Sequence, residues 1–295
     1  MRIAITGITG FVGRHVAEQF PKEDLVGISR RAGYDLSSVD SLVKAFQGVE
    51  VVFHAAGINR EIGQQTYDKV HRRGTANVVK AAQIAGVKKI IMMSFLRARP
   101  NCGSAYHESK WDAEKMIRDS GLDYTILKAG MVYGLGDHML DHLSHIMFTI
   151  PFIPTVGFNP KTTRPVPVEE LVTVVKAAIN GQLTQQTVAV VGGEEIYLSE
   201  AIRRIAKEVD RKILIFPVPV WVQYAAAQVF EWTMKVPLAA KAQVKILTEG
   251  VVEAAPYADE LPEELKPRLN FTSEMIRKGL PPKGRFTLKD LRFFN

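Results

Sequence analysis

The sequence predicts an α/β protein with a doubly wound parallel sheet and a smaller, discontinuous C-terminal lobe. Strand and helix patterns alternate through the first half of the chain with short connections, which is typical of a parallel sheet. The apolar fraction of 46% over 295 residues provides for one large interior. We expect residues 1–165 to form the sheet-containing core, residues 166–192 to return to that sheet, and residues 193–295 to form the smaller lobe.

Short apolar runs, bounded by glycine or polar residues, predict the strands of the sheet. These strands cover residues 3–6, 25–29, 51–54, 89–94, 124–128 and 187–191. Parallel strands place their carboxyl ends along one edge of the sheet, and ligands bind at that edge in folds of this type. The residues that directly follow the strands are therefore the first candidates for a functional site.

Apolar residues at helical spacing predict the helices that connect these strands. The helices cover residues 11–20, 38–46, 66–85, 106–119, 139–147 and 166–179. A proline-broken piece over residues 151–165 interrupts the regular alternation. The change of rhythm marks the point where the chain begins to leave the sheet.

The last part of the chain reads helix, strand, helix, helix and ends in a loop-rich segment from residue 256 onward. Within it, the uncharged stretch over residues 213–230 contains Pro217 and Pro219, which argue against a membrane span. We expect the helix over residues 220–234 to be buried within the lobe. The alternative is a helix that rests on a membrane surface.

Composition narrows the class of protein. The net charge of +7 comes from scattered lysines and arginines, so no nucleic-acid partner is expected. The single cysteine, Cys102, excludes an internal disulfide framework and fits a reducing compartment. Met1 leads directly into the first strand, so we expect no signal or transit peptide and a cytoplasmic location.

The connection after the first strand, Thr6-Gly7-Ile8-Thr9-Gly10-Phe11-Val12-Gly13, carries the strongest functional signal. Gly7 permits a tight turn out of the strand, and Gly10 lets backbone N–H groups approach a pyrophosphate at the helix N-terminus. Gly13 allows the helix to pack closely against the sheet. A strand, a glycine turn and a helix in this order predict a dinucleotide site.

The end of the second strand indicates which dinucleotide is bound. Ser29, Arg30 and Arg31 stand where an acidic residue would bind a free ribose 2′-hydroxyl. A serine and arginines can instead hold a 2′-phosphate, so we expect NADP in preference to NAD. The alternative is that Arg30 and Arg31 are solvated surface charges.

Tyr106 and Lys110 stand four residues apart on a predicted helix, which places the phenol and the ammonium group on one face. Their helix follows the strand that ends at Ser94, close to the expected position of a nicotinamide ring. The ammonium group and an oxidised nicotinamide are expected to lower the pKa of Tyr106 toward neutral pH. The pair thus predicts a proton donor and acceptor.

With these motifs on view, the chain resembles the short-chain dehydrogenase/reductase superfamily, in its extended or atypical branch, which includes sugar-nucleotide epimerases and dehydratases. The resemblance covers nearly the whole length and implies a Rossmann sheet and a substrate-binding lobe. The motifs that carry it are residues 6–13, 34–36, 54–57, 74–79, 106–110 and 132–134. Residues 244–250 and 279–282 resemble atypical members related to the nucleotide-binding accessory subunit of respiratory complex I.

The resemblance implies a role for each matching residue. Pyrophosphate would be bound by Gly7, Gly10, Phe11, Val12 and Gly13, the adenine edge by Asp35 and Leu36, the inner ribose by Ala55, Ala56 and Gly57, and the nicotinamide ribose by Lys110. Read without the resemblance, Ala55 to Gly57 is a packed strand end and Asp35 is a turn or cap residue. Helices after the third and fourth strands often form a dimer interface in the superfamily, which implies a homodimer.

The chain also departs from the superfamily pattern. Phe95 stands where the extended branch usually carries a substrate-polarising serine or threonine, so Ser94 is the nearest candidate for a catalytic hydroxyl. Ser104 is expected to cap the helix of Tyr106. Relatives commonly have asparagine at the position of His71 and arginine at that of Lys128. These changes affect the proton relay and the contacts to substrate.

A histidine-rich stretch raises the question of a metal. Acidic and imidazole side chains recur at helical spacing, namely Asp137, His138, Asp141, His142 and His145. The stretch has no cysteine and no H-E-x-x-H motif, so we expect no metal there.

The function expected from these observations is an NADP- or NAD-dependent oxidoreductase, epimerase or dehydratase acting on a small or nucleotide-linked substrate. In this mechanism Tyr106 transfers the proton and Lys110 tunes it. One alternative is a cofactor-binding protein with little or no turnover that serves as an assembly or redox-sensing partner. Another is a quinone-linked reductase at a membrane surface, in contact through the apolar helix over residues 220–234.

Overall fold

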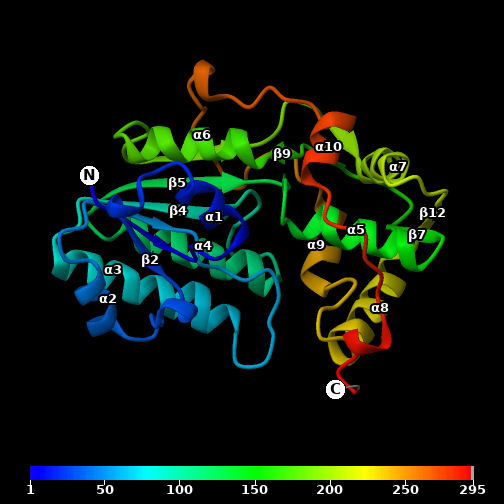
Figure 1. Cartoon of the computed structure of the whole chain (residues 1–295), viewed down its shortest axis with the longest axis horizontal. Coiled ribbons are helices and arrows are strands. Elements are labelled where there is room, and N and C mark those ends of the chain that lie inside the picture. The colour runs from blue at the N-terminus through cyan, green and yellow to red at the C-terminus, as the bar shows by residue number, and fades with distance from the viewer. Residues whose placement is uncertain (294–295) are drawn as a thin grey trace. The chain divides into compact units, whose positions relative to one another are not determined.

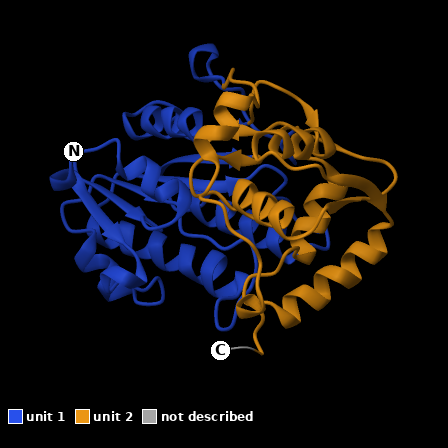
Figure 2. Ribbon diagram, turned by 45° about the vertical axis from the view of Figure 1, so that its right-hand side comes forward, with its two compact units in different colours: residues 1–129, 168–190, 253–266 blue, residues 130–167, 191–252, 267–295 orange. Residues whose placement is uncertain are grey.

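The computed structural model describes residues 1–293, and the chain divides into two compact units (Figure 2). Unit 1 consists of residues 1–129, 168–190 and 253–266, and unit 2 of residues 130–167, 191–252 and 267 onward. Residues 130–165, expected in the sheet-containing core, fall in unit 2. Each unit is therefore built from separate stretches of sequence.

Unit 1 contains a six-stranded sheet in which every pair of neighbouring strands is parallel. The strands are β1 (Ile3–Thr6), β2 (Leu25–Ile28), β3 (Val51–His54), β4 (Lys89–Phe95), β5 (Asp123–Ala129) and β10 (Gln186–Val190). Their order is β10-β5-β4-β3-β1-β2. The doubly wound parallel sheet predicted from the sequence is confirmed, and each predicted strand agrees to within one residue at either end.

The helices of unit 1 cover both faces of this sheet, with α6 on one side and α2 and α3 on the other (Figure 1). They are α1 (Phe11–Ala17), α2 (Val39–Ala45), α3 (Gly74–Ala85), α4 (Ala105–Arg118) and α6 (Val168–Ile179). Helix α1 packs against α6, and α3 packs against both α2 and α4. Buried side chains such as Leu42, Val52 and Ile90 fill the core between α2, α3 and the sheet.

The predicted helix over residues 66–85 is not regular. A π-helical segment, Asp68–Arg73, precedes α3 and carries the buried side chain of His71. Helical periodicity cannot distinguish a π turn from an α turn over so few residues, and π turns occur often at functional sites. Shorter 3₁₀ turns lie at Lys22–Asp24, Arg30–Ala32, Glu263–Leu265 and Leu288–Asp290.

Unit 2 combines helices with small two-stranded sheets around its own apolar core. The helices are α5 (His138–Thr149), α7 (Leu198–Glu208), α8 (Val220–Thr233), α9 (Lys241–Glu249) and α10 (Ser273–Gly279). The strand pairs are β6 (Val132–Tyr133) with β9 (Val166–Pro167), β7 (Phe152–Val156) with β12 (Leu214–Val218), and β8 (Thr162–Thr163) with β11 (Ile196–Tyr197). In the core, the rings of Tyr133 and Phe271 meet edge to face at 4.8 Å.

Helix α8 differs from its expected burial. Only Gln223 and Ala227 of this helix are buried, whereas the side chains of Trp221 and Trp232 are 73% and 66% exposed. The apolar residues of this helix are spread around most of its circumference, so its sequence does not specify a single buried face. Within residues 1–293, no helix combines the length and the apolar character needed to cross a membrane.

Candidate functional site

The turn after β1 has a geometry that only glycine satisfies at two positions. Gly7 adopts a φ of +70°, and a Cβ atom there would lie 2.8 Å from the backbone of Ala56. A Cβ atom on Gly13 would collide with the carbonyl oxygen of Gly7. The N–H of Gly7 donates to the carbonyl of Ile28 at 2.9 Å, which ties the turn to β2. The sheet and helix α1 are therefore in contact through bare backbone.

The same turn leaves backbone open at the carboxyl edge of the sheet. Thr9 and Gly10 are exposed, although the strand before them is buried. Helix α1 begins at Phe11, and neither a capping side chain nor an acidic residue occupies its first turn. Uncapped N–H groups beside an exposed glycine fit the pyrophosphate of a dinucleotide. Val12, which the sequence also predicts to bind the pyrophosphate, is half-buried at the start of the helix.

The strand order reverses between β1 and β3, so the residues after β3 flank the same crevice. The N–H of Ala55 donates to the carbonyl of Thr6 and the N–H of Ala56 to the Thr6 hydroxyl, both at 3.2 Å. Gly57 is exposed, and a Cβ atom there would lie 3.0 Å from Nζ of Lys110. The structure thus brings together the glycine turn, the alanine-glycine run and Lys110.

His54 holds the end of β3 in place through two side-chain contacts, just before the segment Ala55 to Gly57. Its Nδ1 lies 2.7 Å from the hydroxyl of Thr6, and its Nε2 lies 2.9 Å from the hydroxyl of Thr75. Burial, and then the charge of Lys110, lower the pKa of His54 to about 3, so the imidazole is neutral at physiological pH. His54 positions the backbone and carries no charge toward the crevice.

The residues after β2 that we associate with the adenosine half of the cofactor lie at the surface. Arg30 and Arg31 are exposed, and the hydroxyl of Ser29 accepts a hydrogen bond from the N–H of Ala32 at 3.2 Å. With the Gln65 amide turned so that its oxygen faces the guanidinium, Gln65 accepts hydrogen bonds from Arg30 at 2.9 and 3.0 Å. Arg30 is therefore held toward the loop after β3.

Asp35 and Leu36 follow the same turn and have different partners. The carboxylate of Asp35 accepts the N–H of Ser37 at 3.0 Å, as in an Asx turn. Leu36 packs against the core, and its carbonyl accepts a hydrogen bond from the side chain of Asn77 at 2.8 Å. Asp35 thus also serves the local turn that the sequence allowed as its alternative, and Leu36 serves the core.

Tyr106 lies on the first turn of α4 among aromatic rings. Its ring centroid is 5.6 Å from that of Tyr67, 5.4 Å from that of Phe95 and 5.8 Å from that of His71. Its hydroxyl lies 3.5 Å from Oδ1 of Asn59. Burial raises the pKa of Tyr106, so the expected lowering by Lys110 does not occur in the chain itself. The phenol is protonated at neutral pH.

Lys110 lies one turn further along α4. Its own burial limits the effect of its charge on the pKa of Tyr106. The ammonium group is itself buried and donates to the carbonyl of Met93 at 3.0 Å. Burial lowers the pKa of Lys110 to about 8, and the negative charge of Glu114 acts in the opposite direction. With a pKa of about 8, Lys110 is mostly protonated at neutral pH, and burial outweighs its effect on the pKa of Tyr106.

The hydroxyl of Ser94, the candidate catalytic hydroxyl, is bonded to a carboxylate and makes no hydrogen bond to Tyr106 among the described residues. Its Oγ donates to Oε1 of Glu114 at 2.5 Å. Glu114 is fully buried and pairs with Nζ of Lys128 at 3.0 Å and with Arg118 at 3.2 Å. Successive strand residues point to opposite faces, so Phe95 contacts the tyrosine and Ser94 points away from it.

His71 and Asn59 complete the surroundings of Tyr106. Nε2 of His71 accepts the N–H of Ile58 at 3.1 Å, and Nδ1 lies 2.8 Å from the hydroxyl of Ser109, which donates to the carbonyl of Tyr106. These partners assign the proton to Nδ1, and burial lowers the pKa of His71. Asn59 was not found from the sequence, because its loop has no periodic pattern and no motif.

Among the acidic and histidine residues at α5, Asp137 has a structural role at the helix start. The carboxylate of Asp137 accepts the N–H groups of Gly134 and Leu140 at 2.7 and 2.8 Å, which caps the helix. Burial raises the pKa of Asp137 to about 6. Among residues 1–293, no three histidine, cysteine or acidic side chains are arranged to hold a metal ion.

Comparisons with known proteins agree with a dinucleotide site. A family described as NAD(P)H-binding matches residues 30–134. The chain is 27% identical to ceramide reductase of Caulobacter vibrioides over 52% of its own length and 54% of that protein. It is 30% identical to the uncharacterized sugar epimerase YhfK of Bacillus subtilis over 44% of its own length and 72% of that protein.

A longer match extends into unit 2. Subunit 9 of the NADH dehydrogenase [ubiquinone] 1 alpha subcomplex of Mus musculus is 24% identical, over 78% of this chain and 69% of the subunit. Among solved structures, MoeE5 in complex with UDP-glucose and NAD has a TM-score of 0.67 and 15% identity, over 95% of this chain and 97% of that one. The dTDP-4-dehydrorhamnose reductase of Bacillus anthracis in complex with NADP has a TM-score of 0.62 and 19% identity, over 74% and 84%.

These matches carry different weight. The chain spans about half the length of ceramide reductase, so the similarity does not extend to that whole protein. The structural neighbours are too distant in sequence to show more than a shared fold. The match to the sugar epimerase covers 72% of that protein at 30% identity.

Proposed function

Because the chain belongs to the NAD(P)-binding short-chain dehydrogenase/reductase family, in its atypical and epimerase-like branch, we propose that it is an NADP-dependent oxidoreductase with Tyr106 as its proton donor. The observation that carries this proposal is the position of Lys110. Its buried ammonium group lies between the carboxyl ends of β3 and β4, against the backbone of Gly57. A bound nicotinamide ribose would meet a cation there.

The residues that would hold the cofactor follow the carboxyl ends of β1 and β2, with Lys110 on α4. The glycine turn from Gly7 to Gly13 would bind the pyrophosphate, Arg30 and Arg31 the 2′-phosphate, and Lys110 the nicotinamide ribose. When bound, the nicotinamide of the cofactor supplies or accepts a hydride. The chain contributes the orientation of the group and the proton that balances the transfer.

Tyr106 is suited to donate that proton. Burial keeps its phenol protonated, and a protonated phenol can donate to the oxygen of a substrate carbonyl as that oxygen gains charge. In the reverse direction, the phenolate would accept the proton of a hydroxyl group. Lys110 then acts through its charge, by lowering the cost of the phenolate. The relatives indicate a small or nucleotide-linked substrate for such a reaction.

Substitution of Tyr106 tests the proposal. We expect Tyr106→Phe to lower steady NADPH oxidation, measured across panels of carbonyl and quinone substrates, by about 10² to 10⁴-fold, as for loss of a general acid. The affinity for NADPH, measured by titration calorimetry, should stay within about twofold of wild type. Tyr124→Phe, in β5, is the matched control. Full turnover by Tyr106→Phe would contradict the assignment.

The preference for NADP is tested by affinity alone. We expect the dissociation constant for NADPH to be about tenfold below that for NADH, since each charge-assisted hydrogen bond contributes about 1.5–3 kcal/mol. Replacing Arg30 and Arg31 by glutamine should equalise the two constants. Lys22→Gln, at an exposed position in the 3₁₀ turn before β2, is the control for general charge. Equal constants for the wild-type protein would remove the preference.

A second candidate function is cofactor binding with little turnover, in an assembly or redox-sensing role. Phe95 favours it, because this ring contacts Tyr106 where the wider branch has a substrate-polarising hydroxyl, and Ser94 is bonded to Glu114 instead. The similarity to a subunit of NADH dehydrogenase is in keeping with such a role. Tight NADPH binding without turnover on any panel substrate is the result expected from it.

A further inference from the structure

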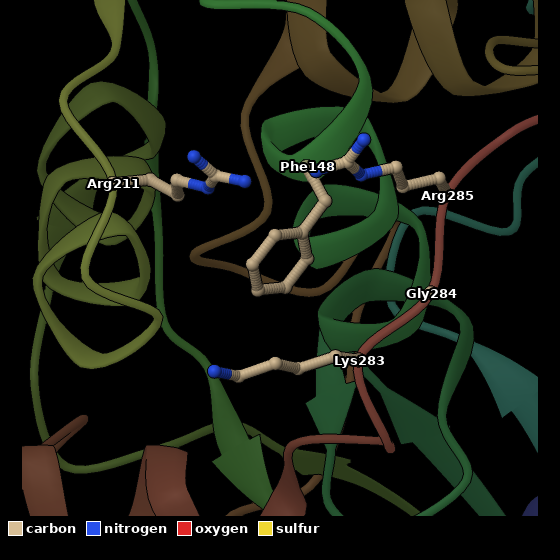
Figure 3. A pocket seen from close by; sticks show the side chains of 5 residues that line it. All are labelled: Phe148, Arg211, Lys283, Gly284 and Arg285. Atoms are coloured by element: carbon tan, nitrogen blue, oxygen red, sulfur yellow. The ribbon is translucent and has the colours of Figure 1, made fainter.

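Unit 2 contains an open pocket of about 420 Å³ that is unrelated to the residues assigned to the cofactor. It is lined by Phe148, Arg211, Lys283, Gly284 and Arg285. Phe148 belongs to the last turn of α5, Arg211 follows α7, and the other three residues follow α10. In Figure 3 the guanidinium of Arg211 and the ammonium of Lys283 extend into the space beside the ring of Phe148.

The three cations of this pocket have no negative partner in the described part of the chain. No carboxylate lines the pocket, and none of the three forms an ion pair within residues 1–293. Arg204, in the same unit, instead pairs with Glu194 at 2.9 Å. Three like charges around one concavity repel one another. Because no carboxylate balances them, the pocket favours a negatively charged ligand.

The pocket is also held in shape by contacts that involve no carboxylate. The guanidinium carbon of Arg211 lies 4.9 Å from the ring centroid of Phe148, which orients its donors. The N–H of Phe286 donates to the hydroxyl of Thr149 at 2.9 Å and fastens the segment to α5. A Cβ atom on Gly284 would collide with the ring of His145, so the backbone lies directly on the helix.

We propose that this pocket binds the phosphate group of a small molecule. Guanidinium groups present planar pairs of donors that match phosphate oxygens, and Lys283 adds a compact positive charge. The volume is within the range of small-ligand sites, and Phe148 offers an apolar surface to the carbon skeleton of the ligand. The phosphate can come from a soluble organic phosphate or from a lipid head group.

Titration calorimetry with inorganic pyrophosphate tests the proposal on the full chain saturated with NADPH, so that the cofactor site is filled. We expect R211Q/R285Q to weaken pyrophosphate binding by about tenfold or more, because two charge-assisted contacts are lost. The matched control, K161Q/K289Q, removes the same charge from exposed lysines of unit 2 outside the pocket. It should change the dissociation constant by less than about twofold.

The outcomes separate a site from general electrostatic attraction. Failure of the wild-type protein to take up pyrophosphate, together with failure to bind phosphate-bearing vesicles, would overturn the proposal. Equal weakening by both variant pairs, or none by R211Q/R285Q, would overturn it as well. An unchanged NADPH affinity in R211Q/R285Q shows that the variant is folded, and it keeps this test independent of the proposed oxidoreductase function.

A vesicle experiment distinguishes the two sources of phosphate. Co-sedimentation with vesicles of phosphatidylcholine and phosphatidic acid, lost in R211Q/R285Q and kept in K161Q/K289Q, assigns the site to a lipid head group. Pyrophosphate binding without such co-sedimentation assigns it to a soluble phosphate. Either result supports the pocket as a phosphate site.

Discussion

Gly13 is the residue where a single added carbon atom should have the clearest effect. A Cβ atom there meets the backbone of Gly7, which cannot move without displacing the turn, whereas a Cβ atom on Gly27 meets only the side chain of Ile8 at 3.1 Å. We expect Gly13→Ala to lower the free energy of unfolding by about 1–3 kcal/mol and Gly27→Ala to cost less. Urea denaturation of both variants measures this. Equal losses would contradict the close approach at Gly13.

Lys110 should make stability depend on alkaline pH. Its pKa is lowered from 10.5 to about 8 in the folded chain, so between these values the unfolded chain binds more protons. The free energy of unfolding should therefore rise as the pH rises from about 8 toward 10. Lys110→Met should reduce this rise. Urea denaturation of both proteins at each pH measures the free energy of unfolding and should show the difference. If the free energy of unfolding changed with pH in the same way in both proteins, the pKa of Lys110 would not be lowered in the folded chain.

Residue types and spacing predicted the cofactor-binding candidates, and the structure brings Gly7, Gly57 and Lys110 to one edge. The sequence alone left open whether Ser94 points into the sheet or toward Tyr106. That orientation follows from Glu114, a partner twenty residues away on a helix, whose buried charge attracts Lys128 and the serine hydroxyl together. A long-range ion pair of this kind leaves no local pattern in a sequence.

At the scale of elements, α4 and β5 are joined by the buried pair of Glu114 and Lys128. Lys128→Met should lower the free energy of unfolding by about 3–5 kcal/mol, because it leaves the carboxylate in an apolar interior with Arg118 as its remaining cation. The double variant E114Q/K128M should be destabilised less than Lys128→Met alone, since no buried carboxylate remains and the charge left on Arg118 is partly exposed to solvent. Additive losses in urea denaturation would contradict this pairing.

Helix α5 should respond to acid through its cap. The pKa of Asp137 is raised from 3.8 to about 6, so the folded chain binds more protons than the unfolded chain between these values. This contribution to stability is present below about pH 4 and is lost as the pH rises through 6. Asp137→Asn retains a capping oxygen and should remove that dependence in thermal unfolding at pH 4 to 7. An unchanged profile would locate the titration elsewhere.

The elements that the sequence predicted well are those whose pattern is set by local burial. Both faces of the sheet are covered, so its strands read as apolar runs. Strand β7 escaped detection because it contains Pro154, which a two-stranded edge tolerates. Helix α8 was assigned the wrong environment because an apolar composition does not reveal whether any partner surface exists to bury it.

For the whole molecule, cofactor binding should protect unit 1 selectively. NADPH at about 100 times its dissociation constant should stabilise the folded state by about 2.7 kcal/mol. In hydrogen exchange we expect slower exchange in residues 7–13 and 55–57, with less change in residues 283–286. Uniform protection across the chain, or none, would not fit a site confined to the carboxyl edge of the sheet.

The path of the chain has a consequence for protein engineering. The backbone passes from one compact unit to the other after residues 129, 167, 190, 252 and 266. No single cut therefore separates the two units, and a fragment that ends at residue 165 would lack the edge strand β10. These units cannot be exchanged between homologous proteins as consecutive modules, and a chimaera must graft several segments at once.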